Sequence, residues 1–189
     1  MVVDVKYGIL VRHAVMQTPG APLEIDTISV GVEEGVIGMC CCPGRIEQHN
    51  DGAHRQRDLI EDLAMVGDWQ PDLVVSLVEL HEFGFLGVAQ LPEEFERRFQ
   101  WQHYPVRDLA APVGAEGENS ALSQWFGSVC RGDRILLHCA AGLGRTGTVA
   151  ARLLMLAGEK ADVAIKRVRT ARPGAIESAS QERFLHNPG

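Results

Sequence analysis

Cys139 and Arg145 are the residues of this sequence whose types and spacing most directly indicate chemistry. Five residues separate them, after an apolar run typical of a buried strand and before an Ala- and Leu-rich stretch typical of a helix. A loop that leads into a helix directs several backbone N–H groups at one point, and the helix dipole adds positive potential there. The segment is therefore expected to bind a dianionic phosphate.

The side chains of this segment suit phosphoryl transfer. The N–H groups of the loop and the helix dipole favour the thiolate of Cys139, which is a nucleophile at neutral pH. The guanidinium of Arg145 can hold two phosphoryl oxygens through contacts that strengthen in the transition state, and a lysine offers no such paired contacts. The hydroxyl of Thr146 can donate to the sulfur when it leaves the phosphoenzyme. We expect Cys139, Arg145 and Thr146 to be catalytic.

The residues between the cysteine and the arginine are expected to bind phosphate through their backbone. Glycines in the loop permit unusual backbone angles and a close approach of the phosphate oxygens. No Gly-Lys-Ser/Thr follows, so the loop differs from a nucleotide P-loop. A lone cysteine would more often be a structural thiol, but strand, His-Cys, five residues, Arg-Thr-Gly and helix together favour a nucleophile. The expected phosphate-binding residues are Ala140, Ala141, Gly142, Leu143, Gly144 and Arg145.

Composition and charge narrow the class of protein. The chain has 189 residues, enough to bury one core without disulfides or metals, and its 46% hydrophobic and 23% charged residues are typical of a globular domain. A formal net charge of -7 argues against nucleic-acid binding by broad phosphate neutralisation. No apolar run approaches the length of a membrane span, and the N-terminus lacks a small-residue cleavage site. We therefore expect a cytoplasmic protein with no nucleic-acid or membrane partner.

The cysteines indicate reduced thiols rather than a disulfide framework or a metal site. They number five, an odd count in a chain too long to need disulfides. Cys40, Cys41 and Cys42 are consecutive, and adjacent strand residues point to opposite faces and cannot converge on one tetrahedral ion. We interpret this run as a strand end with buried thiols. The histidines show no metal-ligand spacing, so no metal or cofactor is expected.

Apolar runs and helical patterns alternate along the chain. The runs at 73–79 and 134–138 are continuous, which suits strands covered on both faces. Strands that alternate with helices indicate an α/β fold, here a single domain over 1–189 with a central, mostly parallel sheet flanked by helices. Expected strands lie at 5–11, 24–30, 36–42, 73–79, 101–106 and 134–138, and expected helices at 56–67, 92–99, 119–130, 145–157, 161–171 and 178–186.

The segment HCAAGLGRTG resembles the HCxxGxxRS/T signature of the protein tyrosine and dual-specificity phosphatases. Together with three further pieces, it looks like the kinase-associated, cyclin-dependent-kinase-inhibitor type of dual-specificity phosphatase. These pieces are CCPGR (41–45), HYPVRD (103–108) and RPGAIESASQERFLH (172–186).

The resemblance covers a catalytic core at 41–186, whereas residues 1–40 show no identifiable similarity. It implies a cysteine-dependent phosphatase with a sandwich fold and a two-step reaction. In the first step Cys139 takes the phosphoryl group, and in the second step water hydrolyses the cysteinyl-phosphate.

The resemblance also implies an acid that protonates the leaving oxygen. The acid of the family occupies a Pro-x-x-Asp position, which Asp108 matches, just after the expected strand 101–106 and before a loop. Glu116 and Glu118 are the alternatives if Asp108 is only a helix or turn cap. Gln181 matches a glutamine that helps to place the hydrolytic water in related enzymes, and a plain surface position on the last helix is its other interpretation.

His138 and a row of basic residues on one expected helix are interpreted as structural rather than catalytic. His138 is expected to fix the loop by hydrogen bonds rather than act as a base, because a thiolate needs no base. Lys166, Arg169 and Arg172 recur every three residues along one expected helix. They could guide anionic substrates to the site, but a solvated helix face is the favoured interpretation.

The expected substrate is a phosphorylated protein or peptide. Ala140, Ala141 and Leu143 are uncharged, whereas phosphoinositide phosphatases of this superfamily tend to carry lysines in the loop. The family resemblance favours dual specificity over phosphotyrosine alone. The alternatives are a phosphatase of a small phosphorylated metabolite or nucleotide and a catalytically weak phosphoprotein-binding module. The presence of all the expected catalytic side chains speaks against the binding module.

Overall fold

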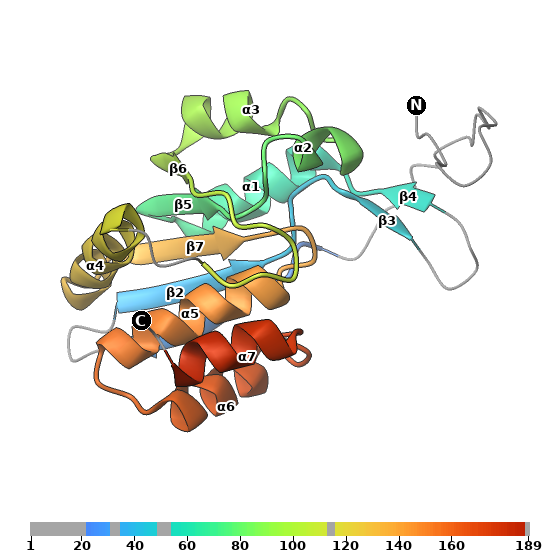
Figure 1. Ribbon diagram of the computed structural model, residues 1–189. Coiled ribbons are helices and arrows are strands. Elements are labelled where there is room, and N and C mark those ends of the chain that lie inside the picture. The colour runs from blue at the N-terminus through green and yellow to red at the C-terminus, as the bar shows by residue number, and fades with distance from the viewer. Residues whose placement is uncertain (1–21, 31–34, 49–53, 113–115, 188–189) are drawn as a thin grey trace.

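The computed structural model describes residues 22–30, 35–48, 54–112 and 116–187, which build an α/β fold on one five-stranded sheet (Figure 1). Its strands are β1 (Asp26–Val30), β2 (Gly35–Cys40), β5 (Leu73–Ser76), β6 (Trp101–His103) and β7 (Arg134–His138). The strand order is β1-β2-β7-β5-β6, in which β1 is antiparallel to β2 and all other neighbours are parallel. The predicted mostly parallel sheet is confirmed.

The central strands β7 and β5 are apolar because both of their faces are covered. Ile135, Leu136 and Leu137 of β7 are buried, as are Val74 and Val75 of β5. Full burial of an aliphatic side chain of this size contributes about 1.5–3 kcal/mol. The buried centre of the sheet therefore supports the loops that follow its strands.

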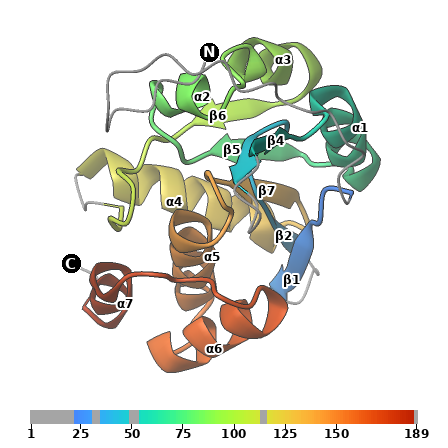
Figure 2. The same ribbon diagram turned by 90° about the vertical axis from the view of Figure 1, so that its right-hand side faces the viewer.

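Helices cover both faces of the sheet. They are α1 (Leu59–Trp69), α2 (Glu82–Phe85), α3 (Leu91–Arg98), α4 (Glu116–Cys130), α5 (Gly144–Leu156), α6 (Ala161–Ala171) and α7 (Ala179–His186). Figure 2 shows α4, α5 and α6 on one face, with α7 packed against α5 and α6. On the other face, the ring of Trp69 at the end of α1 lies against Gly38 of β2, and Phe95 of α3 packs on Trp101 of β6.

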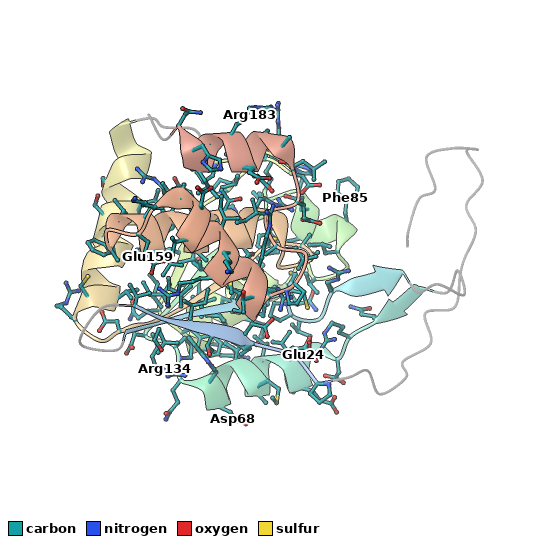
Figure 3. All side chains as sticks on the ribbon, turned by 90° about the horizontal axis from the view of Figure 1, so that it is seen from below. Glu24, Asp68, Phe85, Arg134, Glu159 and Arg183 are labelled. Atoms are coloured by element: carbon teal, nitrogen blue, oxygen red, sulfur yellow. The ribbon has the colours of Figure 1, made fainter. Side chains whose placement is uncertain are left out.

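The carboxyl ends of the parallel strands meet at one end of the sheet. The chain passes there from β7 into α5, and α2 lies at the same end (Figure 1). Figure 3 shows Phe85 of α2 at this end, whereas Arg134, the first residue of β7, lies at the opposite end. Ligands of open α/β sheets bind outside the carboxyl ends of the strands. The expected catalytic residues should therefore meet at this end.

Three short elements were not predicted. Strands β3 (Ile46–Gln48) and β4 (His54–Gln56) form an antiparallel pair apart from the main sheet, and α2 follows β5. Strands of three residues and a helix of four are too short to show a clear period. None of the helices in the described part of the chain has the length and apolar composition needed to cross a lipid bilayer.

Most of the predicted elements are present, with shifts at their ends. The helix predicted from residue 56 begins at Leu59, because the Asp58 side chain caps it by accepting two backbone N–H bonds. The helix predicted from 119 begins at Glu116, in keeping with the favourable effect of acidic residues in a first turn. The predicted strand 5–11 lies outside the described residues. Strands β1 and β2 fall in the region without identifiable similarity and complete the sheet beside β7.

Candidate active site

The loop between β7 and α5 leaves a row of backbone N–H groups without a protein acceptor. In the described part of the chain, the N–H groups of residues 140–145 donate to no oxygen. The first bond of this kind joins the N–H of Gly147 to the carbonyl of Leu143 at 2.9 Å. Free N–H groups at the start of a helix attract anions, and the helix dipole adds to this effect. The loop therefore offers the arrangement that a phosphate requires.

The carbonyl groups of the same loop are bonded on its outer side. The Ala140 carbonyl accepts from the backbone N–H of Cys42 at 3.1 Å and from Nη1 of Arg45 at 2.7 Å. The hydroxyl of Thr148 donates to the Gly144 carbonyl at 2.7 Å. Because the N–H and C=O of a trans peptide point in opposite directions, carbonyls held outward leave the N–H groups directed inward.

Arg172 holds two more of these carbonyls. It caps the end of α6, its Nε donates to the Gly142 carbonyl at 2.6 Å, and its Nη2 donates to the Ala141 carbonyl at 3.2 Å. Its Nη1 pairs with Asp26 of β1 at 2.6 Å, and only 12% of the side chain is exposed. The prediction of a solvated basic stripe is therefore wrong for Arg172. Because α6 ends at Ala171, the side chain leaves the helix face and reaches the loop.

Cys139 is the first residue of the loop and is buried beside the end of β2. Gly142 has a φ of +73°, and a Cβ at this position would lie 2.2 Å from the Cys40 carbonyl oxygen. Only glycine fits so close to β2. Cys40 and Cys42 are buried, and burial raises the pKa of both thiols, so they stay protonated. The predicted strand end with buried thiols is confirmed for Cys40, whereas Cys41 is half-buried and Cys41 and Cys42 follow the strand.

Arg145 lies in the first turn of α5 and its guanidinium is buried. Its Nη1 and Nη2 pair with the Glu82 carboxylate at 2.6 and 2.9 Å, and Nη1 also donates to the Val106 carbonyl at 3.1 Å. Burial alone would lower the pKa of Arg145, but the Glu82 bonds and the nearby Cys139 and Asp108 raise it above its usual value. In the described residues its Nε–H has no acceptor. The edge formed by Nε and Nη2 is therefore suited to hold two oxygens of an anion.

Glu82, the first residue of α2, was not predicted as a site residue. Burial by itself would raise the pKa of Glu82. The bonds from Arg145 and from the Glu79 backbone N–H at 2.7 Å outweigh burial and lower it. The carboxylate is therefore a fixed anion that orients the arginine. Glu82 and Arg145 are 63 positions apart, so no local pattern could have paired them.

Asp108 lies at the site, in the turn that follows β6. Its Oδ1 lies 3.2 Å from Nη2 of Arg145, and 68% of its side chain is exposed. It is thus near the Nε–Nη2 edge of the arginine and largely open to solvent. The alternatives Glu116 and Glu118 are in the first turn of α4.

The turn that carries Asp108 is tied to the start of α7. The Leu109 carbonyl accepts from the hydroxyl of Ser178 at 2.7 Å and from that of Ser180 at 3.5 Å. The Ala110 carbonyl accepts from Nε2 of Gln181 at 3.1 Å. Leu109 has a φ of +56°, a left-handed conformation that costs a non-glycine residue about 1–2 kcal/mol. A few bonds to one helix end hold this strained turn.

Gln181 is fully buried, so its interpretation as a surface residue is wrong. Its Oε1 accepts from the backbone N–H groups of Glu177 and Ser178 at 3.0 and 3.1 Å and completes a capping box. A Cβ on Gly144 would lie 2.9 Å from its Nε2, so the amide lies directly against the phosphate-binding loop. The side chain connects α7, the loop and the Asp108 turn.

His138 precedes the nucleophile within a chain of hydrogen bonds. Trp101 Nε1 donates to Ser76 Oγ at 2.8 Å, and that oxygen lies 2.5 Å from Nε2 of His138. The Ser76 hydroxyl therefore donates to Nε2, and Nδ1–H donates to the Cys139 carbonyl at 3.3 Å. Burial lowers the pKa of His138 to about 4, so the ring is neutral. The prediction that His138 fixes the loop through hydrogen bonds is confirmed.

Thr146 follows the arginine on the first turn of α5 and is buried. Its hydroxyl has no hydrogen-bond partner in the part of the chain that the structure describes. The hydroxyl is therefore free to donate to another group at the site. Among the described residues, no three His, Cys, Asp or Glu side chains are grouped as metal ligands would be.

Comparisons with known proteins identify the class. A family model described as a Swiss Army Knife protein, DSP-PTPase phosphatase domain (PTP-SAK), matches residues 74–185. Human receptor-type tyrosine-protein phosphatase H is 28% identical over 97 residues, which are 48% of this chain and 9% of that protein. The chain thus corresponds to a small part of this much longer relative.

Two solved structures cover almost the whole described fold. The kinase-associated phosphatase, with its catalytic cysteine replaced by serine, superposes with a TM-score of 0.76 over 90% of this chain and 94% of that chain, at 22% identity. Tk-PTP in its active form gives a TM-score of 0.61 and 30% identity over 83% of this chain and 93% of that chain.

The chain belongs to the DSP-PTPase phosphatase domain family. The match places this domain in the protein tyrosine and dual-specificity phosphatase superfamily. The kinase-associated phosphatase shares the fold of this chain.

Proposed function

We propose that this chain is a protein phosphatase of tyrosine or dual specificity that acts through a cysteinyl-phosphate, with one phosphatase domain over residues 1–189. One observation carries the proposal. Cys139, a possible nucleophile, begins a loop whose N–H groups have no acceptor among the described residues, and the Nε–H of Arg145 also lacks one there. Such a constellation binds a dianion and brings it to a sulfur atom.

In the first step, the phosphate dianion of the substrate enters the loop and the Nε–Nη2 edge of Arg145 holds two of its oxygens. The thiolate of Cys139 forms a bond to phosphorus as the bond from phosphorus to the ester oxygen breaks. The proton of the Asp108 carboxyl group goes to that oxygen, so the substrate leaves as an alcohol or phenol. Glu82 keeps the guanidinium oriented throughout.

In the second step, water attacks the phosphorus and the bond between sulfur and phosphorus breaks. Asp108, now ionised, takes a proton from the water, and the free hydroxyl of Thr146 donates to the departing sulfur. One amide hydrogen of Gln181 is bonded to the Ala110 carbonyl. We assign the other amide hydrogen to a bond with the hydrolytic water. Gln181 therefore both holds the turn that carries Asp108 and positions the attacking water.

The surroundings of the site support a protein side chain as substrate. Phe85, in the same short helix as Glu82, is 78% exposed, and Leu109, next to Asp108, is 55% exposed. Exposed apolar side chains near Asp108 and Glu82 suit an aryl group or a peptide better than a small polar metabolite. The uncharged side chains of the loop suit a single phosphate.

The cysteines fit a reducing compartment. All five are free thiols, which supports the proposed cytoplasmic location. The acidic net charge fits the proposed absence of a nucleic-acid partner.

Hydrolysis of an aryl phosphate by the wild type and by Cys139→Ser tests this function. The wild type should turn over and the variant should lose all measurable activity while it still binds a phosphotyrosine peptide. Equal activity of the two proteins, or binding without turnover in the wild type, would contradict the proposal. Rates on phosphotyrosine and phosphoserine peptides then separate tyrosine specificity from dual specificity.

A further inference from the structure

Two arginines from distant parts of the chain meet on the outside of the phosphate-binding loop. Arg45 follows β2 and donates to the Ala140 carbonyl at 2.7 Å. Arg172 follows α6 and donates to the carbonyls of Ala141 and Gly142 at 3.2 and 2.6 Å. Three consecutive peptide carbonyls are thus each held by a guanidinium that lies on the side away from the free N–H groups.

We infer that Arg45 and Arg172 are positioning residues that keep the peptide groups of the loop in their phosphate-binding orientation. This inference rests on the proposed function and deepens it. A peptide group that rotates by half a turn replaces an inward N–H with an inward carbonyl oxygen, which repels both the phosphate and the thiolate. A cation bonded to the outward carbonyl opposes that rotation, because the bond is charge-assisted.

The loop needs such bracing because its own residues resist rotation poorly. Ala140, Ala141 and Gly142 precede α5, so no helical hydrogen bond fixes their carbonyls. Gly142, at a φ of +73°, has no Cβ to restrict alternative backbone angles. The bonds from Arg172 fall on this glycine and on the residue before it.

Arg172 is itself fixed at its far end. Its Nη1 pairs with Asp26 of β1 at 2.6 Å, so all three nitrogens of the guanidinium are engaged at once. Strand β1 at the sheet edge is thereby linked to the phosphate loop. A lysine has the charge but not the planar set of donors that spans two carbonyls and a carboxylate.

Arg167 provides a matched control on α6. It pairs with Glu159 and donates to the Ser29 carbonyl at 2.9 Å, so it also joins the helix to β1 through one carboxylate and one backbone carbonyl. No bond of Arg167 in the described residues reaches the phosphate loop. Its replacement should lower stability without changing phosphate binding.

The test compares Arg172→Met, Arg172→Lys and Arg45→Met with Arg167→Met and the wild type. Calorimetry gives the Kd for inorganic phosphate, and thermal melting gives Tm. Both Arg172 variants and Arg45→Met should raise the phosphate Kd by about tenfold or more. Arg167→Met should change Tm alone.

Each outcome bears on one claim. If the wild type binds no phosphate, the proposed function is wrong. If the wild type binds phosphate and both Arg172→Met and Arg45→Met bind it within about twofold of the wild type, the positioning role is wrong and the function stands. If Arg172→Lys matches the wild type, charge rather than geometry matters and the inference is overturned. If Arg172→Met does not fold, Arg172→Lys and Arg45→Met decide.

Discussion

The loop that binds phosphate and the turn that carries the acid are neighbours with opposite construction. The loop at 139–144 is buried or half-buried, and its carbonyls are bonded to Cys42 just after β2, to α5 and to two arginines. The turn at Asp108 is exposed and left-handed at Leu109, and its carbonyls are held by side chains at the start of α7.

This difference matches the two proposed tasks, which are phosphate binding by the loop and proton transfer by the turn. A cradle for a transition-state charge works best when it is preorganised, because its dipoles then need no reorientation during the reaction. An acid that must meet leaving groups of different shapes can sit on a segment that opens at a low cost. The comparison predicts that damage to the loop affects all substrates alike, whereas damage to the turn depends on the leaving group.

Arg145→Lys should have the largest effect of the changes considered. The charge is kept, but a single ammonium cannot pair with Glu82 and also hold two phosphoryl oxygens. We expect kcat to fall about 100- to 1000-fold, and to a similar degree on aryl and alkyl phosphates. Steady-state rates on both substrates provide the check. Retention of more than about a tenth of wild-type kcat, a deficit below about 1.4 kcal/mol, would contradict the role of Arg145.

Asp108→Asn should show that the turn, unlike the loop, affects catalysis in a way that depends on the leaving group. The amide keeps the size of the side chain but has no proton to transfer, so the loss should be about 100-fold on phosphoserine and below about tenfold on an activated aryl phosphate. The alkaline limb of the kcat/KM profile should flatten for the same reason. Equal losses on both substrates with an unaltered alkaline limb would move the acid to Glu116 or Glu118.

Glu82→Gln should lower kcat by about tenfold, because the guanidinium keeps its charge but loses the paired anion that orients it. The loss of kcat should be similar on aryl and alkyl phosphates, since the change acts through the orientation of Arg145. Glu79→Gln is a suitable control, because Glu79 is bonded to Glu82 through its backbone N–H and carbonyl, which the substitution keeps. A loss confined to alkyl phosphates would place Glu82 in acid catalysis instead.

Ser178→Ala should have the smallest effect. It removes a hydroxyl that donates to the Leu109 carbonyl and also caps α7 by accepting from the Gln181 N–H, so Tm should fall as well. The loss of the bond to Leu109 should reduce kcat on phosphoserine by at most about fivefold, in line with one hydrogen bond of about 1 kcal/mol. Phosphate affinity should not change, because the loop has its own supports. A change in phosphate Kd without a change in kcat would show that the two segments are not independent.

The strand, loop and helix around Cys139 could be predicted because their signals are local. An apolar run, a glycine-containing loop and a helix start are all read within a short stretch, and Asp108 came from a family motif. Glu82, Arg45 and Arg172 could not be found in this way, because their contacts depend on which distant segments the sheet brings to one end. Arg172 even shared the spacing of a helix face, although α6 ends one residue before it.

Trapping of the phosphoenzyme tests the central claim most directly. The wild type is mixed with a 32P-labelled phosphotyrosine peptide, quenched in acid within milliseconds, digested and mapped. The account predicts an acid-stable label on the peptide that contains Cys139, and no label in Cys139→Ser. Turnover without any label on Cys139, or a label on another residue, would contradict a cysteinyl-phosphate mechanism at this loop.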